Sequence, residues 1–90
     1  VGMIVARGVR GPASYTRPGF SVTFGEIQNI KVSSGRMAGV FCSTSTLYRA
    51  FVLSTSGNAV MVQVQDGSGA QIANTTDLSG DHFFVIADGY

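Results

Sequence analysis

The side chains that could support catalysis are few in this sequence and widely spaced. Cys42 is the only cysteine and His82 the only histidine, so a thiol–imidazole pair is conceivable. His82 opens an apolar segment, however, where a structural histidine is expected. Residues 67–69 (Gly-Ser-Gly) lack the spacing of a nucleophile elbow, and no carboxylate pair suited to glycoside hydrolysis is indicated. The sequence therefore predicts a protein that is not an enzyme.

Cofactor and metal sites are not expected either. No glycine-rich phosphate loop followed by Lys and Ser or Thr is present, and the glycines are spread through turns. Asp77 and Asp81 could offer oxygens to Ca²⁺, but their segment lacks the density of alternating acids that a calcium loop uses. Cys42 ends the apolar run 37–42, where a thiol usually packs as a small hydrophobe. We expect no cofactor and no bound metal.

Arginines alternate with aromatic residues in the segment 7–20, which is also rich in glycine and proline. Such a segment could be a nucleic-acid arm, an arm that orders against a neighbouring subunit, or an ordinary surface loop. A pI of about 8.1 is a weak electrostatic signature for nucleic acid, which is therefore not the expected partner. We predict a partner interface made of the following residues: Arg7, Arg10, Tyr15, Arg17, Phe20, Phe83 and Phe84.

The elements that would position these residues are strands of one small all-β domain. Ninety residues leave no room for two independent cores, so the domain spans residues 1–90. Hydrophobic residues make up 44% of the chain and charged residues 12%, which argues against intrinsic disorder. Because β-branched and aromatic residues outnumber the strong helix formers, a coiled coil and a helical bundle are excluded.

Period-two alternation and turn residues divide the chain into about seven or eight short, mostly antiparallel strands. The expected strands are residues 3–7, 20–24, 27–32, 37–42, 47–53, 59–65, 70–73 and 82–87. Residues 54–58 and 66–69 are expected to be turns, and residues 8–19 an extended N-terminal arm or a long loop. This pattern favours a β-sandwich or a small barrel, and the sequence does not choose between them.

Two segments near the ends of the chain are unusually apolar. Residues 82–87 are apolar on both faces, which predicts a central strand or one buried by a partner. Residues 3–6 and 83–87 are therefore candidates for adding a strand to the sheet of another subunit. If residues 7–20 form an arm, deletion of residues 1–18 should abolish assembly and leave the β-type circular dichroism intact.

The charges are divided along the chain. All six basic residues precede residue 51 with Glu26 the only acid among them, and the four aspartates follow residue 65. In the fold the two halves could interleave and cancel, or they could form a basic face and an acidic face suited to packing against copies of the same chain.

Little in the sequence points to a membrane or to an oxidising compartment. The longest apolar stretches are five or six residues, far below the ~20 needed to span a bilayer. A lone cysteine allows no disulfide within the chain, so a secreted module framed by disulfides is not expected. The first residue is Val1, which leaves open a trimmed terminus or an alternative start.

Two stretches carry a resemblance. Residues 62–72 (VQVQDGSGAQI) resemble a hairpin common in small β-domains of tailed-phage structural proteins, and residues 82–90 (HFFVIADGY) are similar to the closing strands of small phage tail proteins. The resemblance implies a virion component made in the host bacterial cytoplasm, in the tail tip, baseplate, fibre or capsid decoration. It implies no catalytic residue.

The leading interpretation is accordingly a non-enzymatic virion protein that binds copies of itself and other virion proteins. The alternative is a carbohydrate-binding or host-receptor-binding β module, whose partner would be a host-surface glycan. Tyr15, Tyr48 and Tyr90 are the aromatic platforms available for sugar stacking, and tryptophan, the commonest platform, is absent.

Overall fold

The computed structural model describes residues 3–30 and 47–90 in full and the backbone of residues 38–42. Within these residues the chain forms strands and no helix, which confirms the all-β class. The strands are β1 (Met3–Arg10), β2 (Phe20–Thr23), β3 (Ala38–Cys42), β4 (Tyr48–Ser56), β5 (Ala59–Asp66) and β6 (His82–Gly89).

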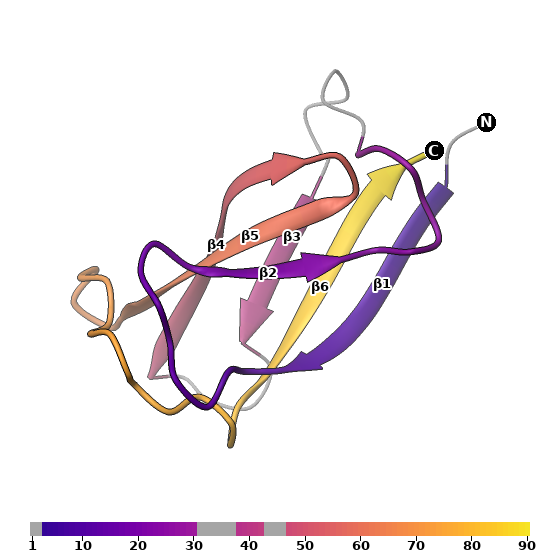
Figure 1. Cartoon of the computed structure of the whole chain (residues 1–90). Coiled ribbons are helices and arrows are strands. Elements are labelled where there is room, and N and C mark those ends of the chain that lie inside the picture. Colours follow the sequence, from indigo (N-terminus) through magenta and orange to yellow (C-terminus); the bar gives the residue numbers. More distant parts are fainter. Residues whose placement is uncertain (1–2, 31–37, 43–46) are drawn as a thin grey trace.

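The strands form two antiparallel three-stranded sheets, one layered on the other (Figure 1). One sheet has the order β1-β6-β3 and the other the order β2-β5-β4. β1 pairs with β6 along its whole length, from Met3 opposite Gly89 to Arg10 opposite His82. The first and last strands are thus neighbours, and the start of β1 lies at the same end of the molecule as the end of β6 (Figure 1).

β6 is the middle strand of its sheet, as the two-sided apolar pattern of residues 82–87 predicts. β1 occupies one of its edges, and β3 occupies the other in a continuous register from Ala38 opposite Ala87 to Cys42 opposite Phe83. Since both edges are hydrogen-bonded within the chain, residues 83–87 cannot add to the sheet of another subunit. That part of the strand-addition hypothesis is wrong.

β4 and β5 form a tight hairpin. The expected loop of five residues shrinks to a turn at Gly57 and Asn58, in which Gly57 takes a φ of 58° that suits glycine. The Asn58 side chain donates to the carbonyl oxygens of Phe24 and Ile27 at 3.0 and 3.2 Å. These bonds fix the hairpin against the segment that follows β2. β4 extends closer to the turn than the sequence pattern indicates, to Ser56, whereas β5 begins at Ala59 as predicted.

The hydrophobic core lies between the two sheets. Alternation predicts Val60, Val62 and Val64 on the core face of β5, and all three are fully buried. Phe83 of β6 faces them from the other sheet and meets Phe20 of β2 edge to face, with ring centroids 5.5 Å apart. The remaining buried side chains are Tyr15, Val22, Phe24, Ile27, Ile30, Ile72, Leu78, Val85 and Ala87.

The described residues contain six strands, and two of the expected strands are only single bridges. Of the expected strand 27–32, Ile30 pairs with Gly89, while residues 31 and 32 lie outside the described part. Of the expected strand 70–73, only Gln71 pairs, with Gln65. Ile27, Ile30 and Ile72 are nevertheless buried, because loop segments close the ends of the core and an apolar residue there needs no strand.

Residues 11–19 form a loop that packs on the chain's own residues 71–81. Its backbone bonds to that segment four times: Gly11 to Asp81, Leu78 to Pro12, Tyr15 to Thr76 and Thr75 to Tyr15, at 2.8–2.9 Å. Gly11 is required by this close approach, because a Cβ there would collide with the carbonyl oxygen of Leu78. Of the two forms expected, the loop and not the extended arm is found.

Candidate functional site: the outer sheet faces

The structure distributes the seven residues of the predicted interface over three settings. Arg7, Tyr15 and Arg17 make contacts within the chain, Phe20 and Phe83 belong to the core region, and Arg10 and Phe84 stand on the outer side of the β1-β6-β3 sheet. They do not form one surface. The residues that remain outside define the candidate site.

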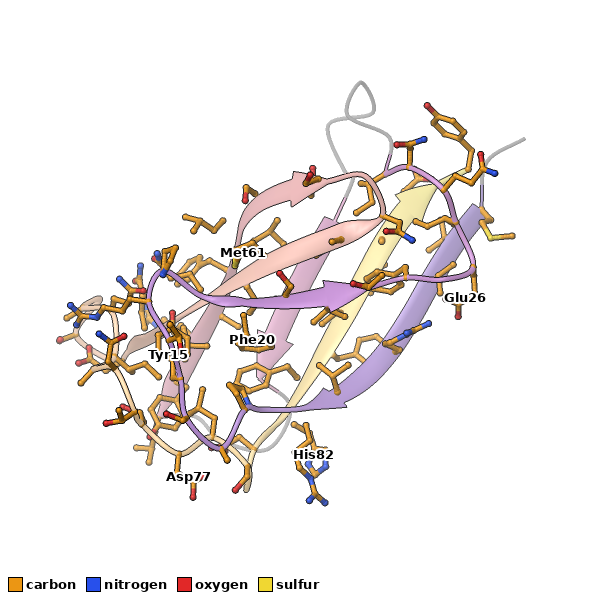
Figure 2. The ribbon with its side chains drawn as sticks, in the orientation of Figure 1. Tyr15, Phe20, Glu26, Met61, Asp77 and His82 are labelled. Atoms are coloured by element: carbon orange, nitrogen blue, oxygen red, sulfur yellow. The ribbon has the colours of Figure 1, made fainter. Side chains whose placement is uncertain are left out.

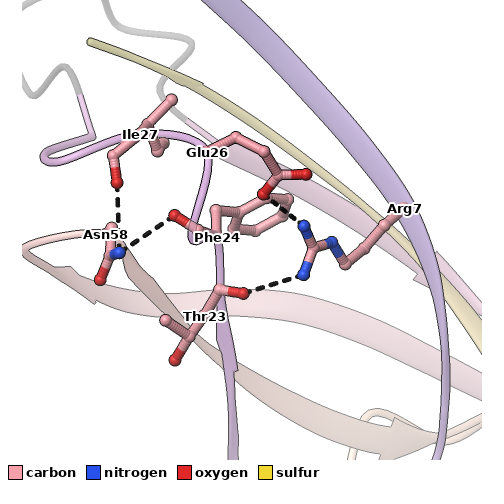
Figure 3. Close-up of polar contacts among 6 residues, drawn as sticks. All are labelled: Arg7, Thr23, Phe24, Glu26, Ile27 and Asn58. Atoms are coloured by element: carbon pink, nitrogen blue, oxygen red, sulfur yellow. Dashed lines mark hydrogen bonds and ion pairs between the residues drawn. The ribbon is translucent and has the colours of Figure 1, made fainter.

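Arg7 is an intramolecular clamp (Figure 3). It projects from β1 toward the segment that follows β2, where it forms an ion pair with Glu26 and donates to the carbonyl oxygen of Thr23 at 3.1 Å. Its guanidinium also lies over the Phe24 ring, 5.0 Å from the centroid. About a third of the Arg7 side chain is exposed, so the clamp sits at the rim of the core.

The surroundings of the Glu26 carboxylate favour its charged form, which this ion pair requires. A hydrogen bond from its own backbone N–H and then the Arg7 side chain lower the pKa of Glu26 below its usual value. The pair ties the edge strand β1 to the opposite sheet. An arginine engaged in this way offers little of its planar group to a partner.

Tyr15 is fully buried and acts as a polar anchor inside the core region (Figure 2). Its hydroxyl accepts the backbone N–H of Val64 at 3.2 Å and lies 3.0 Å from Oε1 of Gln71 and 3.2 Å from the carbonyl oxygen of Pro18. Burial removes Tyr15 from the predicted interface. Tyr15 was assigned to the interface because it is aromatic and lies in a Gly/Pro-rich segment, where a core residue was not expected.

Arg17 is a second clamp within the chain. Its Nε donates to the carbonyl oxygen of Ile72 and its Nη2 to that of Gln71, both at 3.0 Å. Its backbone N–H donates to Oδ1 of Asn74 at 2.8 Å. These bonds satisfy carbonyl groups of a segment that has no strand partner apart from one bridge, so Arg17 replaces part of a missing ladder.

Phe83 is also removed from the predicted interface, because it is fully buried between the sheets. Phe20 is partly buried against the same core and points between the layers (Figure 2). The alternation of β6 explains why Phe83 is buried and Phe84 is not: its odd-numbered residues face inward and its even-numbered residues face outward. Two adjacent phenylalanines in one strand cannot share a face.

Arg10 and Phe84 remain on the outside: Phe84 belongs to a larger apolar surface, and Arg10 lies at one end of it. We call this surface the β1–β6 face and define it by Ile4, Ala6, Phe84 and Ile86. Ile4 is 74% exposed and Ile86 38%, while Phe84 is partly buried. In the register Ala6 is opposite Ile86 and Gly8 is opposite Phe84, so these positions lie side by side on the outer side of the sheet.

A second apolar surface lies on the outer side of the other sheet. We call it the β4–β5 face and define it by Phe51, Leu53 and Met61, the last labelled in Figure 2. Phe51 is 43% exposed and Leu53 46%. No residue of this face was predicted as an interface. The signal was present, however, because residues 47–53 are apolar at positions of both parities, as a strand with two apolar faces would be.

The polar groups of the chain form local structures. Asp66 Oδ1 accepts from the hydroxyl and the N–H of Ser68, and Asp77 Oδ1 accepts in the same way from Ser79. These bonds lower the pKa of both carboxyl groups, and the bond from the serine hydroxyl has the largest effect in each case. Among the described residues no three His, Cys, Asp or Glu side chains gather as a metal site, and no pocket opens there. The Cys42 side chain lies outside the described residues.

The charged halves of the sequence interleave where they are described. β1 from the basic half pairs with β6 from the acidic half, and Arg17 bonds to residues 71 and 72. Arg10 is exposed at one end of the β1–β6 face, and Asp88 lies at the other end, opposite Ile4. Lys31 and Arg36 lie outside the described residues. This arrangement favours the first of the two interpretations of the charge split.

Comparison with family models, curated proteins and solved structures finds no match to this chain. In the part of the chain that the structure describes, no helix has the length and apolar character to cross a bilayer.

Proposed function

We propose that this chain is a non-enzymatic structural module that acts by self-association and by docking to other proteins. The observation that supports this function is the presence of two apolar faces on the outer sides of the two sheets. The β1–β6 face includes Ile4, 74% exposed, and the β4–β5 face includes Leu53, 46% exposed. A β-sheet normally turns polar residues outward on its solvent side, so apolar outer faces mark interaction surfaces.

The charge of the chain is compatible with close packing of copies. A formal net charge of +1 gives little electrostatic repulsion between identical molecules. Two of the arginines that suggested an interface are engaged within the chain, so the association proposed here depends mainly on apolar contact. Salt reduces such contact only slightly, in contrast to association through basic and acidic faces.

The resemblance of residues 62–72 supports placing the module in a tailed-phage particle, where neighbouring proteins would cover its apolar faces. Tail tip, baseplate, fibre and capsid decoration are the positions that this proposal includes. In the same proposal the two facing sheets are a small β-sandwich, since one core is shared between them.

The test is the native mass of the chain in solution, measured by light scattering and native mass spectrometry at low and high salt. We expect an oligomer whose mass is a multiple of 9.4 kDa and which persists at high salt. A mass of 9.4 kDa at all concentrations up to about 1 mM, which corresponds to an association free energy weaker than about −4 kcal/mol, would exclude self-association as the function.

A second function, binding of a host-surface glycan, is favoured by one exposed aromatic side chain. Tyr15 is buried and Tyr48 packs against the core, but Tyr90 is 56% exposed. Its carbonyl oxygen accepts from the backbone N–H groups of Gln28 and Asn29, and both of these residues are exposed. Glycan-array binding that is lost in Tyr90→Ala and kept in Tyr48→Phe would support this function over the first.

A further inference from the structure

We infer that the β1–β6 face is the contact between two copies of this chain, which pack face to face with their β6 strands antiparallel. The inference rests on the proposed self-association and adds to it the surface, the symmetry and the partner. It depends on the shape of the face, on the placement of its charges and on the area available.

The face is a ridge of apolar side chains along the middle strand. Ile86 and Phe84 project outward from β6, and Ile4 stands diagonally beside Ile86 on β1. Between and beside them β1 carries only Ala6 and Gly8, and a Cβ at Gly8 would meet nothing within 4 Å. A second sheet can therefore approach the ridge without displacing a side chain of β1, at the ~10 Å spacing of packed sheets.

The charged residues at the two ends of the face select the orientation. Exposed Arg10 lies at one end, and Asp88, which also has a contact within its own chain, lies at the other. A two-fold axis that reverses the strand direction places Phe84 of one copy over Ile86 of the other. It also brings the Arg10 end of each copy to the Asp88 end of its partner. With the strands parallel, the two Arg10 ends would meet and repel.

The dimensions of the molecule set the size of such a contact. The chain measures 38 by 20 by 20 Å, so one long side has a projected area of about 760 Å². A contact that buries the ~1,200–2,000 Å² of specific protein–protein interfaces therefore has to extend over most of a long side of each copy, beyond the four residues that define the β1–β6 face.

The two competing surfaces fit a second copy less well. On the β4–β5 face the charged residue is Arg49, opposite Gln65, and Gln63 is opposite Phe51, so a two-fold axis there brings no opposite charges together. Pairing of two β1 edges would leave Ile86 uncovered, because β6 is the middle strand. A variant at Ile86 therefore separates face packing from edge pairing.

The experiment compares Ile86→Lys with the matched control Leu53→Lys in the full chain. Both replace an exposed apolar residue of an outer sheet face, at 38% and 46% exposure, so both variants should fold, which far-UV circular dichroism checks. Analytical ultracentrifugation then gives the dimer dissociation constant. We expect Ile86→Lys to raise it at least about a hundredfold, because a lysine would be buried at the centre of the contact, and Leu53→Lys to change it less than about threefold.

The orientation is tested by a charge exchange. Arg10→Glu should raise the dissociation constant about tenfold at low salt, because the new carboxylate repels Asp88 of the other copy at both ends of the contact. Adding Asp88→Lys in the same chain should bring it back to within about threefold of the wild type. If the double variant dimerises no better than Arg10→Glu, the antiparallel orientation is overturned.

The failure of this inference can be told apart from the failure of the proposed function. A wild-type chain that stays monomeric overturns both. A wild-type chain that associates while Ile86→Lys leaves the dissociation constant unchanged keeps self-association and overturns the β1–β6 contact. Dissociation by Leu53→Lys alone assigns the contact to the β4–β5 face and overturns the inference as well.

Discussion

Replacing Tyr15 with phenylalanine tests whether the loop 11–19 packs on its own chain in solution or becomes ordered only against another subunit. The change keeps the buried ring and removes the hydroxyl that accepts the N–H of Val64. That N–H lies in the buried region of β5, so its loss of a partner costs about 1–3 kcal/mol of unfolding free energy. The contacts to Gln71 and Pro18 are lost at the same time.

In a chain of 90 residues, a loss of about 2 kcal/mol lowers Tm by roughly 8–16 °C. Thermal unfolding followed by far-UV circular dichroism, with urea unfolding as a second measure, gives both quantities. Tyr90→Phe is the matched control, because Tyr90 is largely exposed and its hydroxyl has no hydrogen bond within the described residues; it should shift the unfolding free energy by less than about 0.5 kcal/mol.

The result has a direct bearing on function. If residues 7–20 were an arm that orders only against another subunit, Tyr15→Phe would leave the isolated chain as stable as the wild type. Equal effects of Tyr15→Phe and Tyr90→Phe would therefore refute the anchoring role of Tyr15. The structure also reverses the expectation for deletion of residues 1–18, which removes all of β1 and Tyr15: the shortened chain should lose its β-type spectrum along with assembly.

Three further predictions concern the contacts that hold the fold together. Gly11→Ala should lower the free energy of unfolding by about 1–3 kcal/mol in urea unfolding, because the added Cβ collides with Leu78. Gly8→Ala is the control: the space around Gly8 is open, so its free energy of unfolding should stay within about 0.5 kcal/mol of the wild type. Arg17→Met should cost about 1 kcal/mol in the same assay, a value reduced by solvent screening, and a Tm equal to the wild type would contradict the clamp. Acid should destabilise the fold, because the carboxyl groups of Glu26, Asp66 and Asp77 have lowered pKa values. The stability that they contribute is present above about pH 5 and is lost as the pH falls through their pKa values in the folded chain. Urea midpoints measured at pH 7 and at about pH 3 will show this loss.

Two of the strands and the sides on which their residues are buried could be predicted from the sequence. Val60, Val62 and Val64 alternate with polar residues, and residues 82–87 are apolar on both faces; the first set is buried and the second segment is the middle strand of its sheet. Both predictions depend only on the period of two residues that a strand imposes on its side chains. The pairing of β1 with β6 could not be predicted in this way, since strand order depends on contacts between residues far apart in the chain.

The segments that close the ends of the core were harder to predict, because residues there are buried although they do not belong to a strand. Ile30 and Ile72 are buried although each belongs to a loop with at most a bridge nearby. Alternation in such segments looks like a strand, but their backbone groups bond to loops, to side chains such as Asn58 and Arg17, or to the chain end. A sequence pattern reports which side chains are buried and does not report how the backbone is satisfied.

The predicted interface failed in part for a chemical reason. A guanidinium presents several donors in a planar group, and an aromatic ring offers a large apolar surface; both suit an interface, and both suit the rim of a small core equally well. A chain of this size buries a modest fraction of its surface, so many of its core residues lie close to the rim. Arg7 over Phe24, and Tyr15 against Val64, are contacts of that kind.

In so small a protein, an interface is best sought on the outer side of a middle strand. A residue at the rim can pack against the hydrophobic core of its own chain. An apolar side chain on the outer side of a middle strand cannot, because the sheet separates it from that core. Ile86 meets this condition: its neighbours Val85 and Ala87 are fully buried on the inner side, while it projects outward. In the part of the chain that the structure describes, no contact requires an isoleucine there, and lysine or threonine would serve the sheet as well. The proposed self-association accounts for an apolar residue at that position, because a second copy would cover it.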